Sequence, residues 1–125
     1  MHKNKVVHFE IPASDIKKSK AFYESAFDWK VNADDEGYAM AETAETDEGM
    51  SSEVGAINGG FYKRESKKDG PSIVIETDSI DETAAAIEKA GGKITNPKHA
   101  IGEWGFMADF TDPDGNSLGL WEKAK

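Results

Sequence analysis

The sequence contains no cysteine, so disulfide bonds, thiolate metal sites and cysteine nucleophiles are all excluded. It also has no apolar run near the roughly 20 residues that a membrane-spanning helix requires. Basic residues do not balance the acidic ones, and the formal net charge is −9. Because affinity for nucleic acid comes largely from basic contacts with phosphates, this charge argues against such a partner. The composition therefore predicts a cytoplasmic protein without a nucleic acid or a membrane as partner.

The chain has 125 residues, which is enough for one domain with a core of its own. Its most informative part is the segment from residue 6 to residue 31. There, apolar residues alternate with His8 and Glu10, which is the period of a half-buried strand, and Pro12 is expected to end that strand. The elements predicted in the first half are strands over 7–11, 29–32, 38–43 and 54–62, a helix over 16–27 capped by Ser14 or Asp15, and a turn over 34–37.

The second half repeats this plan at an offset of 63 to 64 residues, after a polar linker over Lys63–Pro71. Single-domain organisation over residues 1–125 is therefore expected, with module 1 at about 5–64 and module 2 at about 70–122. One such module buries only the sheet face under its helix, so its other face needs a partner sheet. The elements predicted in the second half are strands over 72–77, 93–96, 106–111 and 117–122 and a helix over 80–90 that ends at Gly91-Gly92.

Three irregular segments lie between these elements. Ala44–Ser52 is acidic and poor in large apolar residues, so we expect an exposed loop. A second loop is expected after residue 96, where Pro97 and His99 occur. Gly59-Gly60 interrupts the fourth predicted strand, which is typical of a bulge or of a backbone that comes close to a ligand, and we expect the bulge.

Several motifs together resemble one known family. They are His8 through Asp15, Ala21-Phe22-Tyr23 with Phe27-Asp28-Trp29, and Asp112-Pro113-Asp114-Gly115-Asn116 ahead of Leu118-Gly119-Leu120-Trp121-Glu122. They span nearly the whole chain, which resembles the vicinal oxygen chelate (VOC) superfamily, also called the glyoxalase, bleomycin-resistance and dioxygenase superfamily. The resemblance implies an α+β fold of two βαβββ modules that form a cup-shaped mixed sheet. It also implies a homodimer.

Metal-using members of this superfamily have ligands on the first strand of each module and a glutamate on the last strand. His8 matches the first of these positions, but Ser72 and Gly119 stand at two others and are not strong side-chain ligands. Because a divalent metal needs three or four side-chain donors, we expect no metal site and no cofactor. A displaced site that uses His8 with Glu10 or Glu76 is the alternative.

The alternation of the strands places the candidate site residues. His8 and Glu10 should face away from the first helix and into the cup, as should Ser72 and Glu76 in the second module. His8 has three interpretations: a hydrogen-bonded residue with no role, a polar contact to a ligand, or a metal ligand. The predicted ligand-binding residues are His8, Glu10, Phe61, Ser72, Glu76, Trp104 and Trp121.

The aromatic members of this set have two interpretations. They form either core and subunit interface, or a stacking platform for a flat ligand. Glu10 and Glu76 are either solvated or a carboxylate pair with shifted pKa values. The leading hypothesis is a metal-independent protein that binds a small organic molecule in the cup. The alternatives are a glyoxalase-like lyase, isomerase or dioxygenase-type enzyme with an altered site, and a non-catalytic stress or interaction protein. Whether it is an enzyme stays open.

Overall fold

The structure is a computed structural model that describes residues 3–34 and 37–125. Its contacts divide the chain into two compact units, which are treated one at a time below. The N-terminal unit is residues 8–71, and the C-terminal unit is residues 72–125 together with residues 3–7. The boundary falls at the end of the polar linker. The predicted turn over 34–37 lies partly outside the described residues.

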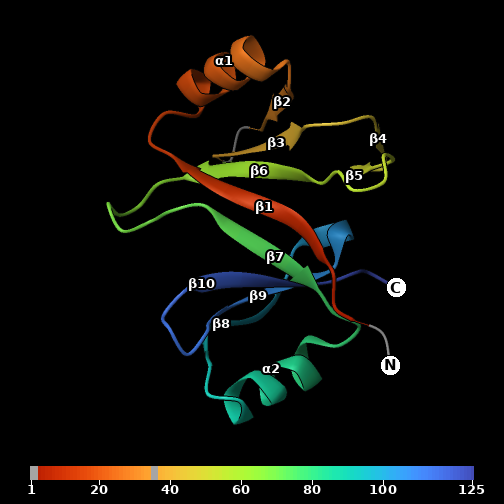
Figure 1. Cartoon of the computed structure of the whole chain (residues 1–125), viewed down its shortest axis with the longest axis vertical. Coiled ribbons are helices and arrows are strands. Elements are labelled where there is room, and N and C mark those ends of the chain that lie inside the picture. Colours follow the sequence, from red (N-terminus) through yellow and green to blue (C-terminus); the bar gives the residue numbers. More distant parts are fainter. Residues whose placement is uncertain (1–2, 35–36) are drawn as a thin grey trace. The chain divides into compact units, whose positions relative to one another are not determined.

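The N-terminal unit has the predicted order of strand, helix and three strands, with a small ribbon inserted before the last strand (Figure 1). Its main sheet has the strand order β2-β3-β6-β1. β1 and β6 are parallel, and the other neighbours are antiparallel. The elements are β1 (Val6–Ala13), α1 (Ile16–Phe27), β2 (Lys30–Ala33), β3 (Tyr38–Glu42), β4 (Thr46–Asp47), β5 (Met50–Ser51) and β6 (Asn58–Lys63).

Helix α1 has the bounds that the sequence predicts, because both of its ends carry a local signal. The Asp15 carboxylate accepts hydrogen bonds from the backbone N–H groups of Lys17 at 3.0 Å and Lys18 at 3.3 Å, which is the N-cap arrangement. At the other end, Asp28 adopts the left-handed conformation with φ of 59°. The chain then turns into β2, where Val31 N donates to the Glu24 carboxylate at 3.0 Å.

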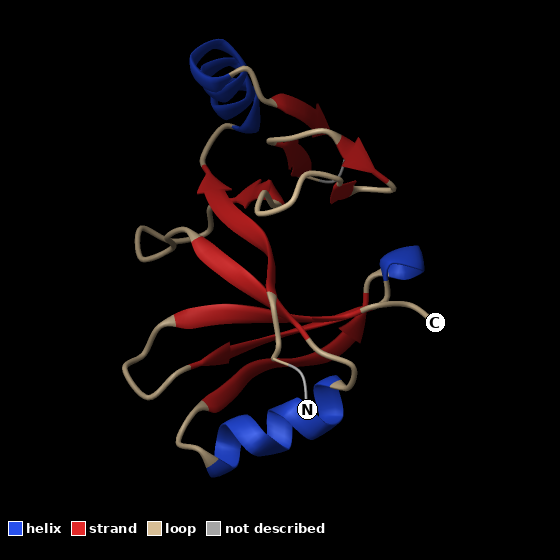
Figure 2. Cartoon of the chain, turned by 45° about the vertical axis from the view of Figure 1, so that its right-hand side comes forward, coloured by secondary structure: helices blue, strands red, loops and turns tan. Residues whose placement is uncertain are grey.

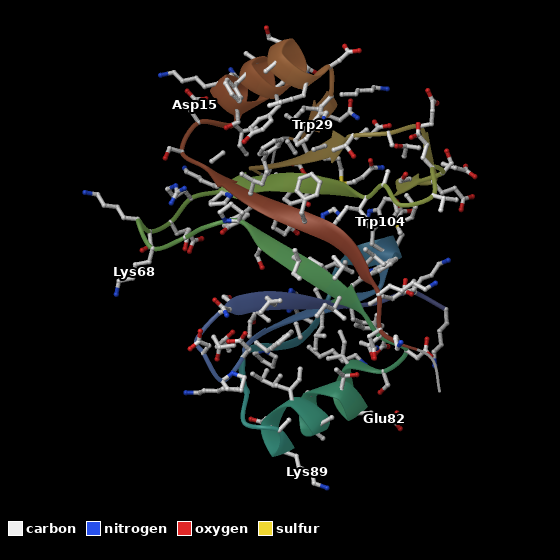
Figure 3. The ribbon with its side chains drawn as sticks, viewed as in Figure 1. Asp15, Trp29, Lys68, Glu82, Lys89 and Trp104 are labelled. Carbon is white, nitrogen blue, oxygen red and sulfur yellow. The ribbon has the colours of Figure 1, made fainter. Side chains whose placement is uncertain are left out.

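The core of the N-terminal unit lies between α1 and its sheet. Tyr23 of α1 stacks on Trp29 at 4.9 Å between ring centroids, and it also contacts Phe61 at 5.1 Å. Trp29 is labelled in Figure 3 near α1. Phe9 and Ile11 of β1 pack against the same cluster, as the alternation of that strand predicts. The buried members of the cluster are Ala13, Val31, Ala39, Ala41 and Phe61.

The C-terminal unit repeats the plan with the strand order β7-β10-β9-β8. β7 and β10 are parallel, and the other neighbours are antiparallel. Figure 2 shows helices in blue and strands in red, and one α-helix lies beside the strands of each unit. The elements are β7 (Ser72–Glu76), α2 (Ile80–Lys89), β8 (Lys93–Ala100), the 3-10 helix η1 (Gly102–Trp104), β9 (Phe106–Thr111) and β10 (Ser117–Glu122).

Helix α2 packs on the other cluster of buried apolar residues, which are Ile80, Ala108, Phe110 and Leu120. Its N-terminus is held twice: the Ser79 hydroxyl accepts from Glu82 N at 3.1 Å, and the buried Glu122 carboxylate of β10 accepts from Ile80 N at 2.8 Å. The α+β class and the two β-α-β-β-β orders are therefore confirmed. No helix among the described residues is long and apolar enough to cross a membrane.

Four details of the sequence-based prediction are wrong. The acidic segment that was expected to be a loop contains the β4–β5 ribbon, in which Thr46 pairs with Ser51. β6 starts at Asn58 rather than at residue 54. β1 continues through Pro12, since the register with β6 is kept. β8 continues through Pro97, where the register with β9 is irregular, because β8 is the last strand in its order and a missing N–H is tolerated at an edge.

Candidate functional site

The strand face of the N-terminal unit that points away from α1 carries polar side chains. Phe9 and Ile11 are committed to the core, so His8 and Glu10 lie on the opposite face of β1. Their side chains are 21% and 19% exposed, respectively. In the parallel register, His8 is paired with Asn58 and Glu10 with Gly60, so these positions of β6 share that face.

Tyr38 of β3 joins His8 and Glu10. The Tyr38 hydroxyl lies 3.0 Å from His8 Nε2 and donates to Glu10 Oε2 at 3.1 Å. His8 Nε2 and Glu10 Oε1 are 3.6 Å apart. Three titratable side chains from two strands therefore form one connected cluster, which we call the His8–Glu10–Tyr38 cluster.

Gly60 makes this cluster possible. β6 lies between β1 and β3, so the Tyr38 side chain must cross the backbone of β6 to reach Glu10. A Cβ atom built on Gly60 would collide with the hydroxyl and ring of Tyr38, and one built on Gly59 would collide with the ring of Phe9. The registers of β6 with β1 and β3 are regular, so the expected bulge is wrong. The two glycines instead leave room for the side chains of Phe9 and Tyr38, and a close approach of their backbone to a ligand stays a prediction.

The surroundings shift two proton equilibria in the cluster. Burial lowers the pKa of His8 from 6.5 to about 4, so the imidazole is neutral near pH 7. The pKa of Tyr38 is raised, first by burial and then by the charge and hydrogen bond of Glu10. Both effects favour uncharged His8 and protonated Tyr38. The cluster can therefore exchange hydrogen bonds without a change of charge on these two residues.

The predicted site residues of the C-terminal unit form a second group. Glu76 of β7 is paired in register with Trp121 of β10, so both lie on one strand face. The Trp121 indole N–H donates to the backbone oxygen of Trp104 at 2.7 Å, and Trp104 is 49% exposed on the 3-10 helix η1. Trp104 is labelled in Figure 3. The Ser72 hydroxyl donates to the backbone oxygen of Ser117 at 2.8 Å, which ties β7 to β10.

Phe61 does not lie where the sequence-based prediction puts it. It alternates with Gly60 on β6, so its side chain points toward α1 and not toward the face that carries His8. It is 0% exposed and packs on Tyr23. Phe61 is therefore a core residue and not a ligand contact on the face of His8.

The donor set does not fit the metal centre of the metal-using superfamily members. Gly119 offers no side chain, and a Cβ atom there would already lie 3.3 Å from Val74 Cγ2. The Ser72 hydroxyl is engaged with a backbone oxygen. Among residues 3–34 and 37–125, no group of three His, Cys, Asp or Glu side chains is arranged to hold a metal ion.

Sequence reasoning missed Tyr38. The sequence did contain a signal, because Tyr38 begins a predicted strand and two adjacent glycines in a strand indicate that another group can lie close to its backbone. What was missing was the strand order: only the placement of β6 between β1 and β3 brings Tyr38 over Gly60 to Glu10.

Comparisons with known proteins agree with this fold. A family model described as the Glyoxalase/Bleomycin resistance protein/Dioxygenase superfamily matches residues 5–120. A "Glyoxylase-like domain-containing protein" from Didymella fabae is 32% identical over 93 residues, which are 67% of this chain and 66% of that protein. The chain thus spans just under two thirds of that curated relative.

Two solved structures illustrate the similarity in three dimensions. A hypothetical protein from Bacillus halodurans C-125 has a TM-score of 0.70 at 19% identity, with 99% of this chain and 97% of that chain covered. A variant of methylmalonyl-CoA epimerase from Streptomyces coelicolor, in complex with 2-nitronate-propionyl-CoA, has a TM-score of 0.67 at 18% identity, with 97% and 98% covered. At these identities the likeness concerns the fold alone.

Proposed function

Since the chain belongs to the glyoxalase, bleomycin-resistance and dioxygenase superfamily, we propose that it binds a small organic molecule without a resident metal. The observation that carries this proposal is the His8–Glu10–Tyr38 cluster, with its distances of 3.0 and 3.1 Å. His8 and Glu10 are partly buried, and about a fifth of each side chain is exposed to solvent. A small number of polar groups that fix the orientation of a bound molecule is typical of ligand sites.

Binding without metal is favoured by the state of His8. His8 stands at a ligand position of the metal-using members, but its Nε2 is engaged with Tyr38, which leaves one ring nitrogen for an ion. The partner positions Ser72 and Gly119 supply no strong donor, as described above. An organic ligand needs no such donor set, and the described face offers it hydrogen-bonding groups.

Binding is also favoured over acid–base catalysis. A catalytic base works best when its pKa lies near the working pH. The pKa of His8 is lowered to about 4, and that of Tyr38 is raised, so neither is poised to exchange a proton near pH 7. His8 and Tyr38 are therefore better suited to holding a ligand than to exchanging protons with it.

An isomerase remains the second candidate. It is favoured by the separation of 3.6 Å between His8 and Glu10 and by the similarity in fold to an epimerase. Such an enzyme would move a proton at carbon, so deuterium would enter its substrate from D₂O. A homodimer and a cytoplasmic location stay predictions that follow from the family resemblance and the composition.

The test is a binding screen by NMR on ¹⁵N-labelled protein with a panel of neutral molecules of low molecular weight. We expect some compounds to shift the amide signals of Gly60 and Tyr38. The His8→Gln variant should bind those compounds up to about tenfold more weakly, since one hydrogen bond contributes about 1 kcal/mol. His99→Gln is the matched control, because His99 is exposed and its ring Nδ1 lies 3.0 Å from the backbone oxygen of Pro97.

Four results would contradict the proposal. Compounds that shift only the signals of Trp104 and Trp121 would move the site to the C-terminal unit. An unchanged affinity in His8→Gln would remove His8 from the site. No binding anywhere in a broad panel would favour the interaction protein, and deuterium incorporation by any panel member would favour the isomerase.

A further inference from the structure

The His8–Glu10–Tyr38 cluster has a fixed hydrogen-bond direction. The Tyr38 hydroxyl has one proton and lies within hydrogen-bond distance of both Glu10 and His8. An ionised carboxylate can only accept, so the proton of Tyr38 points to Glu10. The Tyr38 oxygen must then accept from His8, and the donor is the N–H at Nε2.

The second ring nitrogen of His8 follows from the first. Near pH 7 the ring is neutral and holds one proton, because burial lowers the pKa of His8 to about 4. With that proton on Nε2, Nδ1 carries a lone pair and is an acceptor. No hydrogen bond from a described residue to Nδ1 accompanies the bond at Nε2. Since no fully buried side-chain nitrogen or oxygen of the described chain lacks a partner, Nδ1 is in reach of solvent.

We infer that Glu10, acting through Tyr38, holds His8 in the Nε2–H tautomer, so that Nδ1 accepts a hydrogen bond from an O–H or N–H group of the ligand. Glu10 and Tyr38 are positioning residues here, and His8 is the contact. The tautomer stands on the hydrogen-bond distances together with an ionised Glu10 and a neutral His8, whereas the ligand class rests on the proposed function.

This arrangement selects between chemical classes. A ligand with a hydroxyl, amide N–H or amine can donate to Nδ1 of His8. A ligand that offers only acceptors, such as an ether or a carboxylate, would set its lone pairs against that of Nδ1 and against the Glu10 carboxylate. Leaving such groups unpaired or opposed costs affinity, and that cost is the basis of discrimination. Tyr62, paired with Tyr38 in register, and Met40 provide flat and apolar surface on the same face.

The tautomer is tested first, without any ligand. Long-range ¹H–¹⁵N correlation spectra of the labelled protein at pH 7 separate the two neutral forms of histidine. We expect His8 to give the pattern of a proton on Nε2. A proton on Nδ1, or an average of the two forms, would overturn the inference whatever the ligand is.

Two variants then ask whether Glu10 sets the tautomer. Glu10→Gln keeps a carbonyl oxygen as an acceptor for Tyr38, so the Nε2–H form should persist. Glu10→Leu removes the acceptor atoms of residue 10, so the Tyr38 hydroxyl can donate to Nε2 of His8 instead. The tautomer population of His8 should then move toward the Nδ1–H form. An unchanged tautomer in Glu10→Leu would overturn the role of Glu10. If that variant does not fold, the wild-type spectrum still decides the tautomer.

The ligand class is tested with two isomers of one formula, benzyl alcohol and anisole. Only the alcohol can donate a hydrogen bond. We expect it to bind about three- to tenfold more tightly than anisole and to shift the Nδ1 signal of His8, as one net hydrogen bond predicts. Equal or tighter binding of anisole would overturn the ligand class. If neither compound binds and His8 still shows the Nε2–H pattern, the inferred ligand contact at Nδ1 is wrong. That result would also count against the proposed function, but it would leave the tautomer unaffected.

Discussion

In the N-terminal unit, the strand face opposite α1 carries a connected set of polar groups, with Tyr38 crossing Gly60 to reach His8 and Glu10. The matching strands of the C-terminal unit use their face differently. There, the hydroxyl of Ser72 is tied to a backbone oxygen, and Gly119 lies close to Val74. The comparison teaches that a repeated β-α-β-β-β plan fixes where side chains point but not what chemistry they bring.

The largest expected effect concerns the core rather than either strand face. Phe61→Ala should lower the free energy of unfolding by about 3–5 kcal/mol, because it truncates a fully buried aromatic side chain. Trp104→Ala, at a side chain that is 49% exposed, should cost less than about 1 kcal/mol. Urea titrations of both variants check this. Similar costs would mean that Phe61 is not the core residue described here.

A glycine comparison tests the difference between the two faces directly. Gly60→Ala should cost about 3 kcal/mol and break the contacts of Tyr38 with His8 and Glu10, since the new methyl group occupies the place of the Tyr38 hydroxyl. Gly119→Ala should cost about 1 kcal/mol or less, because its nearest neighbour would lie at 3.3 Å and is a side-chain methyl group.

Thermal unfolding of the two alanine variants measures the difference, and NMR of His8 reports whether Tyr38 has moved. Gly70→Ala is the control, because nothing lies within 4 Å of its new methyl group. The comparison fails if Gly119→Ala proves as costly as Gly60→Ala.

The proton equilibrium of His8 predicts a dependence of stability on pH. Below about pH 6.5 the unfolded chain takes up a proton at His8, whereas in the folded chain His8 is protonated only near pH 4. The free energy of unfolding should therefore fall as the pH falls through this window, by up to about 3 kcal/mol at about 1.4 kcal/mol per pKa unit. Glu10 on β1 and Tyr38 on β3 are the titratable groups beside His8.

Chemical denaturation between pH 4 and pH 7 checks this prediction by difference. His8→Gln should lose less stability on acidification than the wild type, while His99→Gln should follow the wild type. Carboxylates also titrate in this range, but they are common to all three proteins. Equal slopes in His8→Gln and wild type would contradict the burial effect on His8.

The smallest expected effect compares the two helix caps. Asp15 accepts from two backbone N–H groups of α1, so Asp15→Ala should cost about 1 kcal/mol. Ser79→Ala should cost less, because the Glu122 carboxylate still accepts from Ile80 N at the start of α2. Thermal melts of the two variants measure this difference. A larger loss in Ser79→Ala would mean that Glu122 does not support the helix.

Much of the fold was predictable because its signals are local. Asp15 and Asp28 mark the ends of α1, and the Asp112-to-Asn116 turn separates β9 and β10 at the expected residues. The wrong details had a different origin. Pro97 is tolerated because β8 is the last strand in its order, β1 keeps its register with β6 through Pro12, and the acidic segment gains its ribbon from pairing between Thr46 and Ser51.

The candidate site divides in the same way. The alternation of β1 placed His8 and Glu10 on the face away from α1, since successive side chains of a strand alternate. The same rule, applied in the register of β6, would have put Phe61 in the core; its aromatic character alone did not say which face it joins.

The sequence by itself determined the α+β class, the two repeated units, the bounds of α1 and the polar side of β1, because caps, turns and alternation act over a few residues. Only the tertiary structure decided that Tyr38 completes the cluster, that Gly60 makes room for it and that Phe61 is core. These depend on β6 lying between β1 and β3, a pairing of segments far apart in the chain that no local signal records.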